Sequence, residues 1–399
     1  MHPMLDEPRA LQHLMDLLAI PGSSGREGAV ARAVQSKLRA AGVRPAWMRF
    51  DRANERLARA LGRDRGDFEV GNLLVRLPGT RPGPRRMFLG HMDTVPLCRG
   101  ARPVRRGREI RPASRDTALG GDNRTAVAAL VTLAETLLRQ KLPHPPLTLA
   151  FTICEEIGLY GAKYLRLSDA GRPAVAFNLD SGTPSKIIAG AIGATKWEAD
   201  IHGISSHAGV RPEAGVSAIL IAARAIERVA ARGWFGAIAK GRRRGKANAG
   251  VIKGGEATNE VTRHVFVRGE CRSHDPRFLE KITAEWRAAF EWAARSVRNR
   301  DGACGRADFR AAHDYRAFRL KDSHPAVRFA VEAARAIGLD PAVVAMDGGL
   351  DANPLNAAGL PTVTLGAGQH NPHSLDEYVA IPEYLDACRL ALRLATAEM

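Results

Sequence analysis

The most constraining feature of the sequence is an apolar run that ends in two adjacent carboxylates. Residues 146–153 are mostly apolar and predict a buried strand. Glu155 and Glu156 follow at its carboxyl end, where open α/β sheets place their ligands. Adjacent side chains leaving a strand point in different directions, so one carboxylate can bind a metal ion while the other faces a water on that ion. Standing alone, the pair would indicate only a solvated turn.

Two further segments carry the same kind of side chains. The predicted strand at residues 87–90 is followed by His91 and Asp93, whose spacing of two places them on the same side of an extended chain. The imidazole can then bind a metal while the carboxylate holds a neighbouring group in place. Asp122 follows two glycines and opens an apolar helix that continues to residue 138. It could bridge two metal ions, or it could simply cap that helix.

Another predicted strand, residues 174–179, ends in Asp180. The alternation of such strands with helices predicts an α/β sheet whose ligand edge is lined by four side chains: His91, Asp122, Glu156 and Asp180. A last buried strand, residues 361–365, leads into a loop with two histidines, His370 and His373. From the sequence pattern alone, either histidine could be a metal ligand.

The order of elements changes near residue 191. From there to about residue 314 we predict strand, helix, strand, strand, helix and strand, the order of a ferredoxin-like βαββαβ module. Helices and buried strands then resume. We therefore predict a mixed-sheet α/β catalytic domain built from residues 1–190 and 316–399, interrupted by an inserted α+β domain of residues 191–315.

The composition restricts the cellular setting and the partners. Lys and Arg number 59 against 42 Asp and Glu, and two basic runs, residues 99–115 and 240–246, hold much of the excess. Aromatic residues are 6% of the chain and none interleaves with either run, so we expect solvated loops, not nucleic-acid binding. The five cysteines form no C-x-x-C pair, and no export signal or run of about eighteen apolar residues appears. These features predict a cytoplasmic protein without a membrane partner.

Six motifs, in this order, resemble the M20 family of co-catalytic metallopeptidases and, within it, the peptidase T-like branch. They lie at residues 90–96 (GHMDTVP), 120–123 (GGDN), 154–158 (CEEIG), 178–180 (NLD), 206–209 (SHAG) and 373–378 (HSLDEY). The resemblance implies a zinc-peptidase catalytic domain with an inserted lid and dimerisation domain. It also implies a cis peptide between Asp122 and Asn123.

The resemblance further implies two divalent metal ions, zinc with cobalt or manganese as alternatives. Their ligands would be His91 and Asp180 at one ion, Glu156 and His373 at the other, and Asp122 between them. Glu155 would be the general base that takes a proton from the water between the ions. Asp93 would orient His91.

In the inserted domain, the resemblance implies three residues that contact the substrate. His207 would reach an active site, that of the partner subunit in a homodimer, and stabilise an oxyanion. Asn259 and Arg272 would hold the substrate, and Arg272 would do so by binding the carboxylate of the substrate. Without the resemblance, loop caps and a solvated strand residue would explain these three equally well. The sequence departs from this resemblance at Asp347. Tripeptidases of this branch have an Arg at the corresponding position, and that Arg is expected to bind a peptide terminus.

These expectations combine into a hydrolase that cleaves an amide bond in a small peptide or an N-acyl amino acid. Within the class, the alternatives to an aminopeptidase are a carboxypeptidase and an N-acyl-amino-acid amidohydrolase. From another class, the alternative is a non-catalytic, metal-stabilised binding protein. Glu155 argues against that last alternative, because a scaffold needs no general base.

Overall fold

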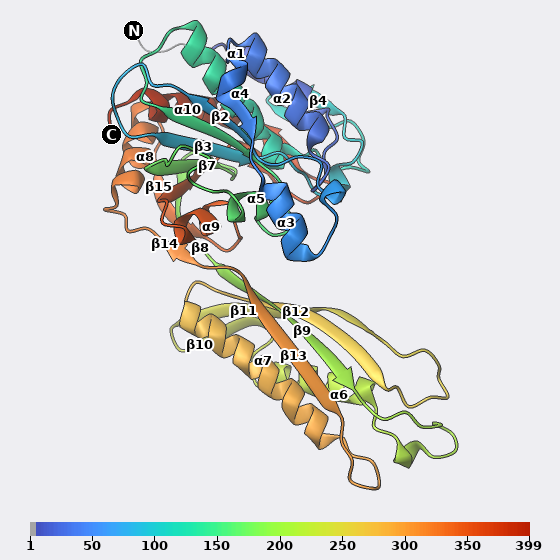
Figure 1. The fold of residues 1–399 in the computed structure, drawn as a ribbon. Coiled ribbons are helices and arrows are strands. Elements are labelled where there is room, and N and C mark those ends of the chain that lie inside the picture. Colours follow the sequence, from blue (N-terminus) through green and yellow to red (C-terminus); the bar gives the residue numbers. More distant parts are fainter. Residues whose placement is uncertain (1–4) are drawn as a thin grey trace. The chain divides into compact units, whose positions relative to one another are not determined.

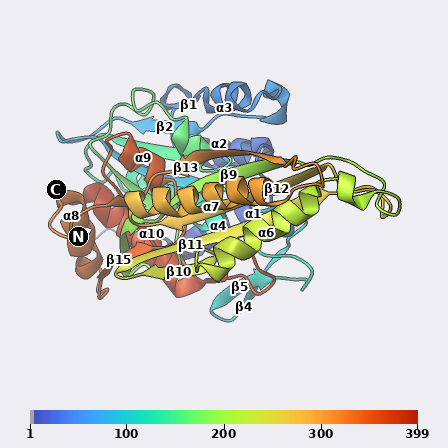
Figure 2. The same cartoon turned by 90° about the horizontal axis from the view of Figure 1, so that it is seen from below.

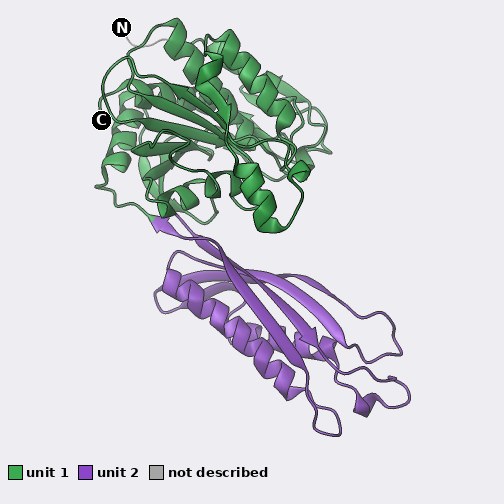
Figure 3. Cartoon of the chain, viewed as in Figure 1, with its two compact units in different colours: residues 1–190, 319–399 green, residues 191–318 purple. Residues whose placement is uncertain are grey.

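The computed structural model describes residues 5–399. Contacts divide the chain into two compact units, drawn in different colours in Figure 3. Unit 1 comprises the described residues up to Gly190 together with Arg319–Met399, and unit 2 is Ala191–Phe318. The predicted mixed α/β class is confirmed, since strands and helices alternate through both parts of unit 1. None of the helices between residues 5 and 399 has both the length and the apolar character needed to cross a membrane.

Unit 1 is built on a nine-stranded mixed sheet (Figure 1). Its strands are β1 (Met48–Phe50), β2 (Leu73–Leu77), β3 (Arg86–His91), β6 (Leu147–Thr152), β7 (Val175–Leu179), β8 (Lys186–Ala191), β14 (Phe318–Arg319), β15 (Ala342–Met346) and β16 (Thr362–Leu365). The order is β1-β2-β6-β3-β7-β16-β8-β14, with β15 paired to β8. The four central strands, β6, β3, β7 and β16, are parallel, so their carboxyl ends meet at one edge.

Helices cover both faces of these central strands. The helices of unit 1 are α1 (Glu7–Leu18), α2 (Gly28–Ala40), α3 (Ala53–Leu61), α4 (Gly121–Arg139), α5 (Tyr160–Lys163), α8 (Pro325–Ala336), α9 (Ala352–Ala357) and α10 (Ile381–Thr396). Phe88 belongs to the large apolar core that contains α4, whereas the next residue, Leu89, belongs to a smaller core that contains residues of α5 and α9. Because alternate strand residues face opposite sides, both faces are packed, which explains why these strands read as continuous apolar runs.

Unit 1 also has a small antiparallel sheet that the sequence did not suggest. It consists of β17 (Gln369–His370), β18 (Tyr378–Ala380), β5 (Glu109–Pro112) and β4 (Pro103–Arg106), in that order. The expectation that residues 99–115 form a solvated loop is therefore wrong for the hairpin β4–β5. In β5 buried residues, Ile110 and Pro112, alternate with partly exposed ones, but the many arginines of this run make the alternation hard to recognise in the sequence. The turn between β4 and β5 contains Gly107, whose φ of 62° is a conformation that glycine adopts without strain.

Unit 2 contains a five-stranded antiparallel sheet with two long helices (Figure 2). Its elements are β9 (Gly193–His202), α6 (Ala218–Ala231), β10 (Gly236–Lys240), β11 (Arg243–Gly254), β12 (His264–Ser273), α7 (Pro276–Ser296) and β13 (Arg306–Tyr315). The order β10-β11-β12-β9-β13 contains the predicted βαββαβ arrangement plus one extra edge strand, β10. This strand pairs with β11 across the second basic run, so that run is also a hairpin and not a loop.

Candidate active site

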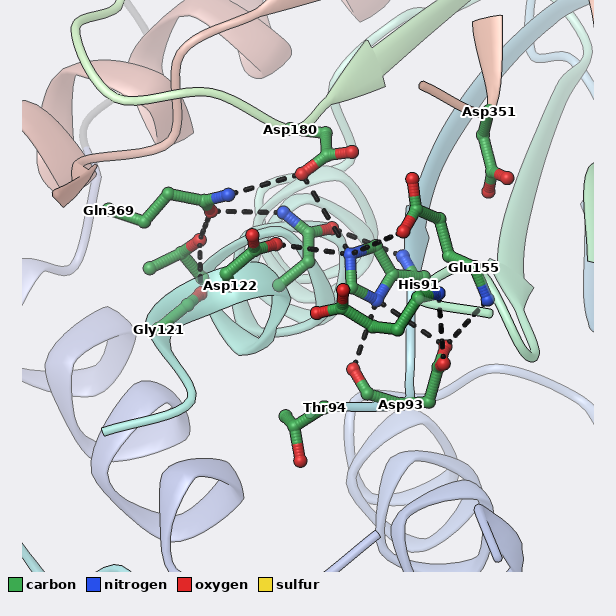
Figure 4. Close-up of polar contacts among 12 residues, drawn as sticks. His91, Asp93, Thr94, Gly121, Asp122, Glu155, Asp180, Asp351 and Gln369 are labelled. Atoms are coloured by element: carbon green, nitrogen blue, oxygen red, sulfur yellow. Dashed lines mark hydrogen bonds and ion pairs between the residues drawn. The ribbon is translucent and has the colours of Figure 1, made fainter. Parts of the chain in front are cut away.

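Three parallel strands bring the predicted ligands together at one edge of the large sheet. His91 is the last residue of β3 and pairs with Thr152, the last residue of β6. Glu155 and Glu156 therefore leave the sheet beside His91. Asp180 follows β7 directly. Figure 4 shows Asp122, Asp180 and Glu155 converging on His91.

Asp122 reaches this edge from the first turn of α4. The start of α4 is irregular, with non-helical dihedral angles at Asp122 and Asn123. The Asp122 side chain points to His91, with Oδ1 3.1 Å from Nε2. The peptide between Asp122 and Asn123 is cis, as the resemblance implied. Gly120 has a φ of 79°, a conformation that glycine adopts without strain.

The loop before Asp122 is fixed by Glu377, a residue that the sequence analysis did not assign. One oxygen of this buried carboxylate accepts hydrogen bonds from the backbone N–H groups of Leu119 and Gly120, both at 2.8 Å. The other oxygen accepts from the N–H of Asp122 at 3.0 Å. A buried N–H without a partner costs about 1–3 kcal/mol, so one side chain stabilises the whole approach to Asp122. Its place in the HSLDEY motif was the available signal.

The potential ligands form two groups that share Asp122. In the first, His91 Nε2 lies 3.1 Å from Asp122 Oδ1 and 3.9 Å from Asp180 Oδ1. In the second, His373 Nε2 lies 2.9 Å from Glu156 Oε2 and 3.6 Å from Asp122 Oδ2. Within each group the ligand atoms lie within 4.8 Å of one another. The two oxygens of Asp122 thus face different histidines, as a carboxylate bridging two ions requires.

The chemistry of this cluster fits divalent cations. Glu156 Oε1 is buried and has no hydrogen-bond partner among residues 5–399. Imidazole and carboxylate are ligands suited to zinc. Burial, together with the nearby Asp122, raises the pKa of Asp180 to about 8, and burial raises the pKa of Glu155 well above its ordinary range. Burial alone would lower the pKa of His91, but hydrogen bonds to Asp122 and Asp93 raise it well above its ordinary value. A divalent ion would relieve this concentration of carboxylates.

Asp93 organises the turn that carries both glutamates. Its Oδ1 accepts from the N–H of Glu155 at 3.0 Å, and its Oδ2 accepts from the N–H of Glu156 at 3.3 Å. His91 Nδ1 lies 3.4 Å from Asp93 Oδ1 and 3.0 Å from the Asp93 carbonyl oxygen. Ser24 donates its hydroxyl to Asp93 Oδ2 at 2.6 Å. Asp93 therefore fixes the His91 ring and the direction in which Glu155 leaves the sheet.

Glu155 lies beside the potential ligands but belongs to neither group. Its Oε2 is 3.9 Å from His91 Nε2. On its other side lies Asp351, a buried carboxylate that the sequence analysis did not assign (Figure 4). Asp351 accepts the Thr152 hydroxyl at 2.6 Å, and burial raises its pKa to about 6. Asp351 does not directly follow a predicted strand, so the sequence gives no sign that it lies beside β6 and Glu155. Its position depends on tertiary packing.

Two buried amides support the metal-ligand groups from behind. Gln369 Nε2 donates to Asp180 Oδ1 at 3.1 Å, and Gln369 Oε1 accepts from Asn123 Nδ2 at 3.0 Å. Asn123 Oδ1 in turn accepts from the backbone N–H of His91 at 3.1 Å. These bonds link β3, α4 and β17, so one continuous network orients His91 and Asp180. Sequence spacing gives no sign of it, because Asn123 and Gln369 are far apart in the chain.

The structure distinguishes the two histidines that follow β16, His370 and His373. His370 Nε2 pairs with Glu383 at 2.5 Å, and its ring stacks on Tyr378. His373 instead lies in the second ligand group, in a left-handed conformation with φ 61°. The structure therefore places His373 with Asp122 and Glu156, where the resemblance had placed it.

The three predicted substrate contacts lie in unit 2. His207 is exposed, and its segment forms a β-bridge with Glu260, next to the exposed Asn259. Arg272 lies in β12, where its guanidinium donates two hydrogen bonds to Glu270 at 2.9 and 3.1 Å. Arg272 pairs with Ala194 at the start of β9, whereas His207 follows the end of β9. Contact of these residues with a substrate stays a prediction.

Known proteins are similar to this chain in sequence and in fold. The model of Peptidase family M20/M25/M40 matches residues 87–397. The uncharacterized protein YqjE of Bacillus subtilis is 30% identical over 392 residues, covering 98% of each chain. Peptidase T of Escherichia coli K12 is 25% identical over 369 residues, covering 82% of this chain and 85% of its own.

Solved structures give the same relationship. A tripeptidase from Staphylococcus aureus superposes with a TM-score of 0.86 at 28% identity, covering 98% of each chain. Aminopeptidase PepT from Bacillus cereus superposes with a TM-score of 0.82 at 30% identity, again over 98% of each chain. The similarity therefore extends over both units of the chain.

Proposed function

This chain belongs to peptidase family M20/M25/M40 and is a metal-dependent hydrolase, and from that premise we propose that it is a dinuclear aminopeptidase of the peptidase T type. Its substrates would be small peptides. One observation carries the dinuclear mechanism: two ligand groups share Asp122, and the carboxylate of Glu155, which belongs to neither group, stands 3.9 Å from His91. The aminopeptidase assignment is supported by the similarity to peptidase T. That arrangement provides five ligands for two ions and leaves one acid free for proton transfer.

The residues divide the chemistry as follows. Two divalent ions, zinc with cobalt or manganese as alternatives, would polarise the scissile carbonyl and lower the pKa of a water held between them. His91, Asp180, Asp122, Glu156 and His373 would hold the ions. Glu155 would accept the proton of that water and pass it to the leaving amine. Asp93 keeps Glu155 and His91 in place through the hydrogen bonds described above.

Unit 2 would supply the lid of the site. His207 would stabilise the oxyanion that develops on the substrate, and Asn259 and Arg272 would hold the substrate itself. At about 3.4 Å per residue, Ala194 and His202 at the two ends of β9 are separated by about 27 Å, so Arg272 and His207 lie toward opposite ends of this sheet. We therefore propose a homodimer in which His207 acts in the partner subunit's site.

Co-expression of two inactive variants tests that arrangement. Glu155→Ala lacks the base but keeps His207, and His207→Ala has the reverse defect. Random pairing makes about half of the dimers mixed, and in each mixed dimer one of the two sites has both Glu155 and His207. We therefore expect about a quarter of the wild-type activity to return. Each variant expressed alone is the control. Absence of recovery from two folded variants would contradict an active site shared between subunits.

The five cysteines are free, and four of them are buried. Unpaired cysteines are typical of a reducing compartment, so we propose that the protein acts in the cytoplasm.

Turnover of a mixed substrate panel tests the function. The panel contains free and N-blocked di- and tripeptides and N-acyl amino acids, assayed with zinc-, cobalt- and manganese-loaded protein and a chelated control. We expect cleavage of free peptides, loss of cleavage when the amino terminus is blocked, and no turnover after chelation. Cleavage of free tripeptides would also show that Asp347 does not exclude this activity.

Other results of the panel point to the alternatives. Cleavage of only the blocked or N-acyl compounds would identify a carboxypeptidase or an N-acyl-amino-acid amidohydrolase. Silence across the panel with two metals bound would contradict hydrolysis and favour a metal-stabilised binding protein.

A further inference from the structure

A cavity of about 460 Å³ lies in unit 1 next to the active site, and the proposed reaction does not use it. It is lined by the loop after α1, the loop after β3 and the start of α4. Thr94 and Gly120 form part of its wall, and they are close neighbours in the sequence of Asp93 and Asp122. Its volume is in the range of sites for small molecules.

The charged residues that line the cavity are all arginines: Arg26, Arg99, Arg102 and Arg124. No Asp or Glu between residues 5 and 399 lines it. Arg99 and Arg102 are exposed and come from the first basic run of the sequence, and Arg26 is only loosely paired, at 3.8 Å, with Glu69. Four cations of one sign around one hollow create a positive potential that favours an anion.

Arg124 adds a buried positive charge to the wall of the cavity. Its side chain is 1% exposed, and its Nη2 makes only long hydrogen bonds, 3.3 and 3.4 Å, to the carbonyl oxygens of Ile20 and Gly22. Its Nε and Nη1 are buried without any hydrogen-bond partner in the described structure. Asp93 and Glu27 attract the guanidinium through space without a direct hydrogen bond to it. Asp93 and Glu27 Oε1 accept from other groups, whereas Glu27 Oε2 is itself buried without a hydrogen-bond partner in the described structure. Two unpaired donors of a buried cation are costly unless something accepts from them.

We propose that this cavity binds a small multivalent oxyanion, held between the buried Arg124 and the exposed Arg99 and Arg102. A phosphate group or a polycarboxylate would fit, because both present several oxygens to the planar guanidinium fork. The site is independent of the proposed peptidase reaction, since none of its four arginines belongs to the metal-ligand groups. It also assigns a function to Arg99 and Arg102, which are otherwise exposed charges.

Calorimetric titration of the full-length, metal-loaded protein with inorganic phosphate at constant ionic strength tests the proposal. We expect saturable binding that the double variant Arg99→Ala/Arg102→Ala weakens by about tenfold or more. The matched control is Arg105→Ala/Arg106→Ala, which removes the same charge from the same basic run, outside the cavity lining. Affinity for phosphate should change less than about twofold in this control. Parallel titrations with pyrophosphate and citrate distinguish phosphate from polycarboxylate chemistry.

Three results would overturn the anion site. One is the absence of saturable binding of phosphate, pyrophosphate and citrate. Another is an equal loss of affinity in the two double variants, which would mean that only net charge matters. The last is binding that disappears when the metals are chelated, because the ions themselves would then hold the phosphate. Binding that persists in the chelated protein and depends on Arg99 and Arg102 supports the site.

Discussion

Replacing Glu155 with alanine is expected to lower kcat by about a thousandfold or more while both metal ions stay bound. Glu155 belongs to neither ligand group, so its removal takes no donor from an ion. Its backbone N–H, which donates to Asp93, is unaffected by truncation of the side chain, so the turn that carries Glu156 keeps its anchor. The loss therefore falls on proton transfer and not on metal binding.

The measurement combines steady-state kinetics with metal analysis of the purified variant. The neighbouring substitution Glu156→Ala is the matched control, since it removes an adjacent carboxylate of the same size that lies 2.9 Å from His373. That control should lose metal as well as activity. Near-normal activity of Glu155→Ala would show that another group is the base, and metal loss equal to that of Glu156→Ala would make Glu155 a ligand.

The positions of the site residues that follow strands could be predicted because their signal is local. A buried strand is readable as an apolar run, and parallel neighbours place their carboxyl ends together, so His91, Glu156 and Asp180 could be expected at one edge. Asp122 was different. An aspartate at the start of a helix gives the same sequence signal as a cap and as a ligand. Its position depends on Glu377, far along the chain, which accepts a hydrogen bond from the backbone N–H of Asp122.

The remaining features depend on contacts that no local pattern reports. Asp351 lies beside Glu155 only because α9 packs near the end of β6, where Thr152 donates to it. Gln369 reaches Asp180 through a short strand, β17, that has too few residues for a periodic signal. The hairpin β4–β5, and β10 with the first half of β11, were read as loops because exposed arginines and lysines mask the alternation of a half-exposed strand. In each case tertiary structure outweighs local composition.

Replacing Asp122 with asparagine is expected to have a larger effect, because it should remove both metal binding and turnover. Asp122 Oδ1 lies 3.1 Å from His91 Nε2, and Oδ2 lies 3.6 Å from His373 Nε2, so each oxygen serves one group. An amide has one oxygen and no negative charge, and it cannot bridge two cations. We expect kcat/KM to fall by about a thousandfold or more and the metal content to fall below two ions per chain.

The same variant should also lose the stability that bound metal provides. Ligands that bind only the folded state stabilise it, by about 2.7 kcal/mol at a free concentration one hundred times Kd, so wild-type protein should show a lower Tm after chelation. In Asp122→Asn that dependence of Tm on added metal should largely vanish, whereas in Glu155→Ala it should persist. The exposed Asp116, replaced by asparagine, is the control for the loss of one carboxylate in the same segment. Two ions per chain and activity within about tenfold of wild type in Asp122→Asn would contradict a bridging role, because one shared carboxylate is what joins the two ligand groups.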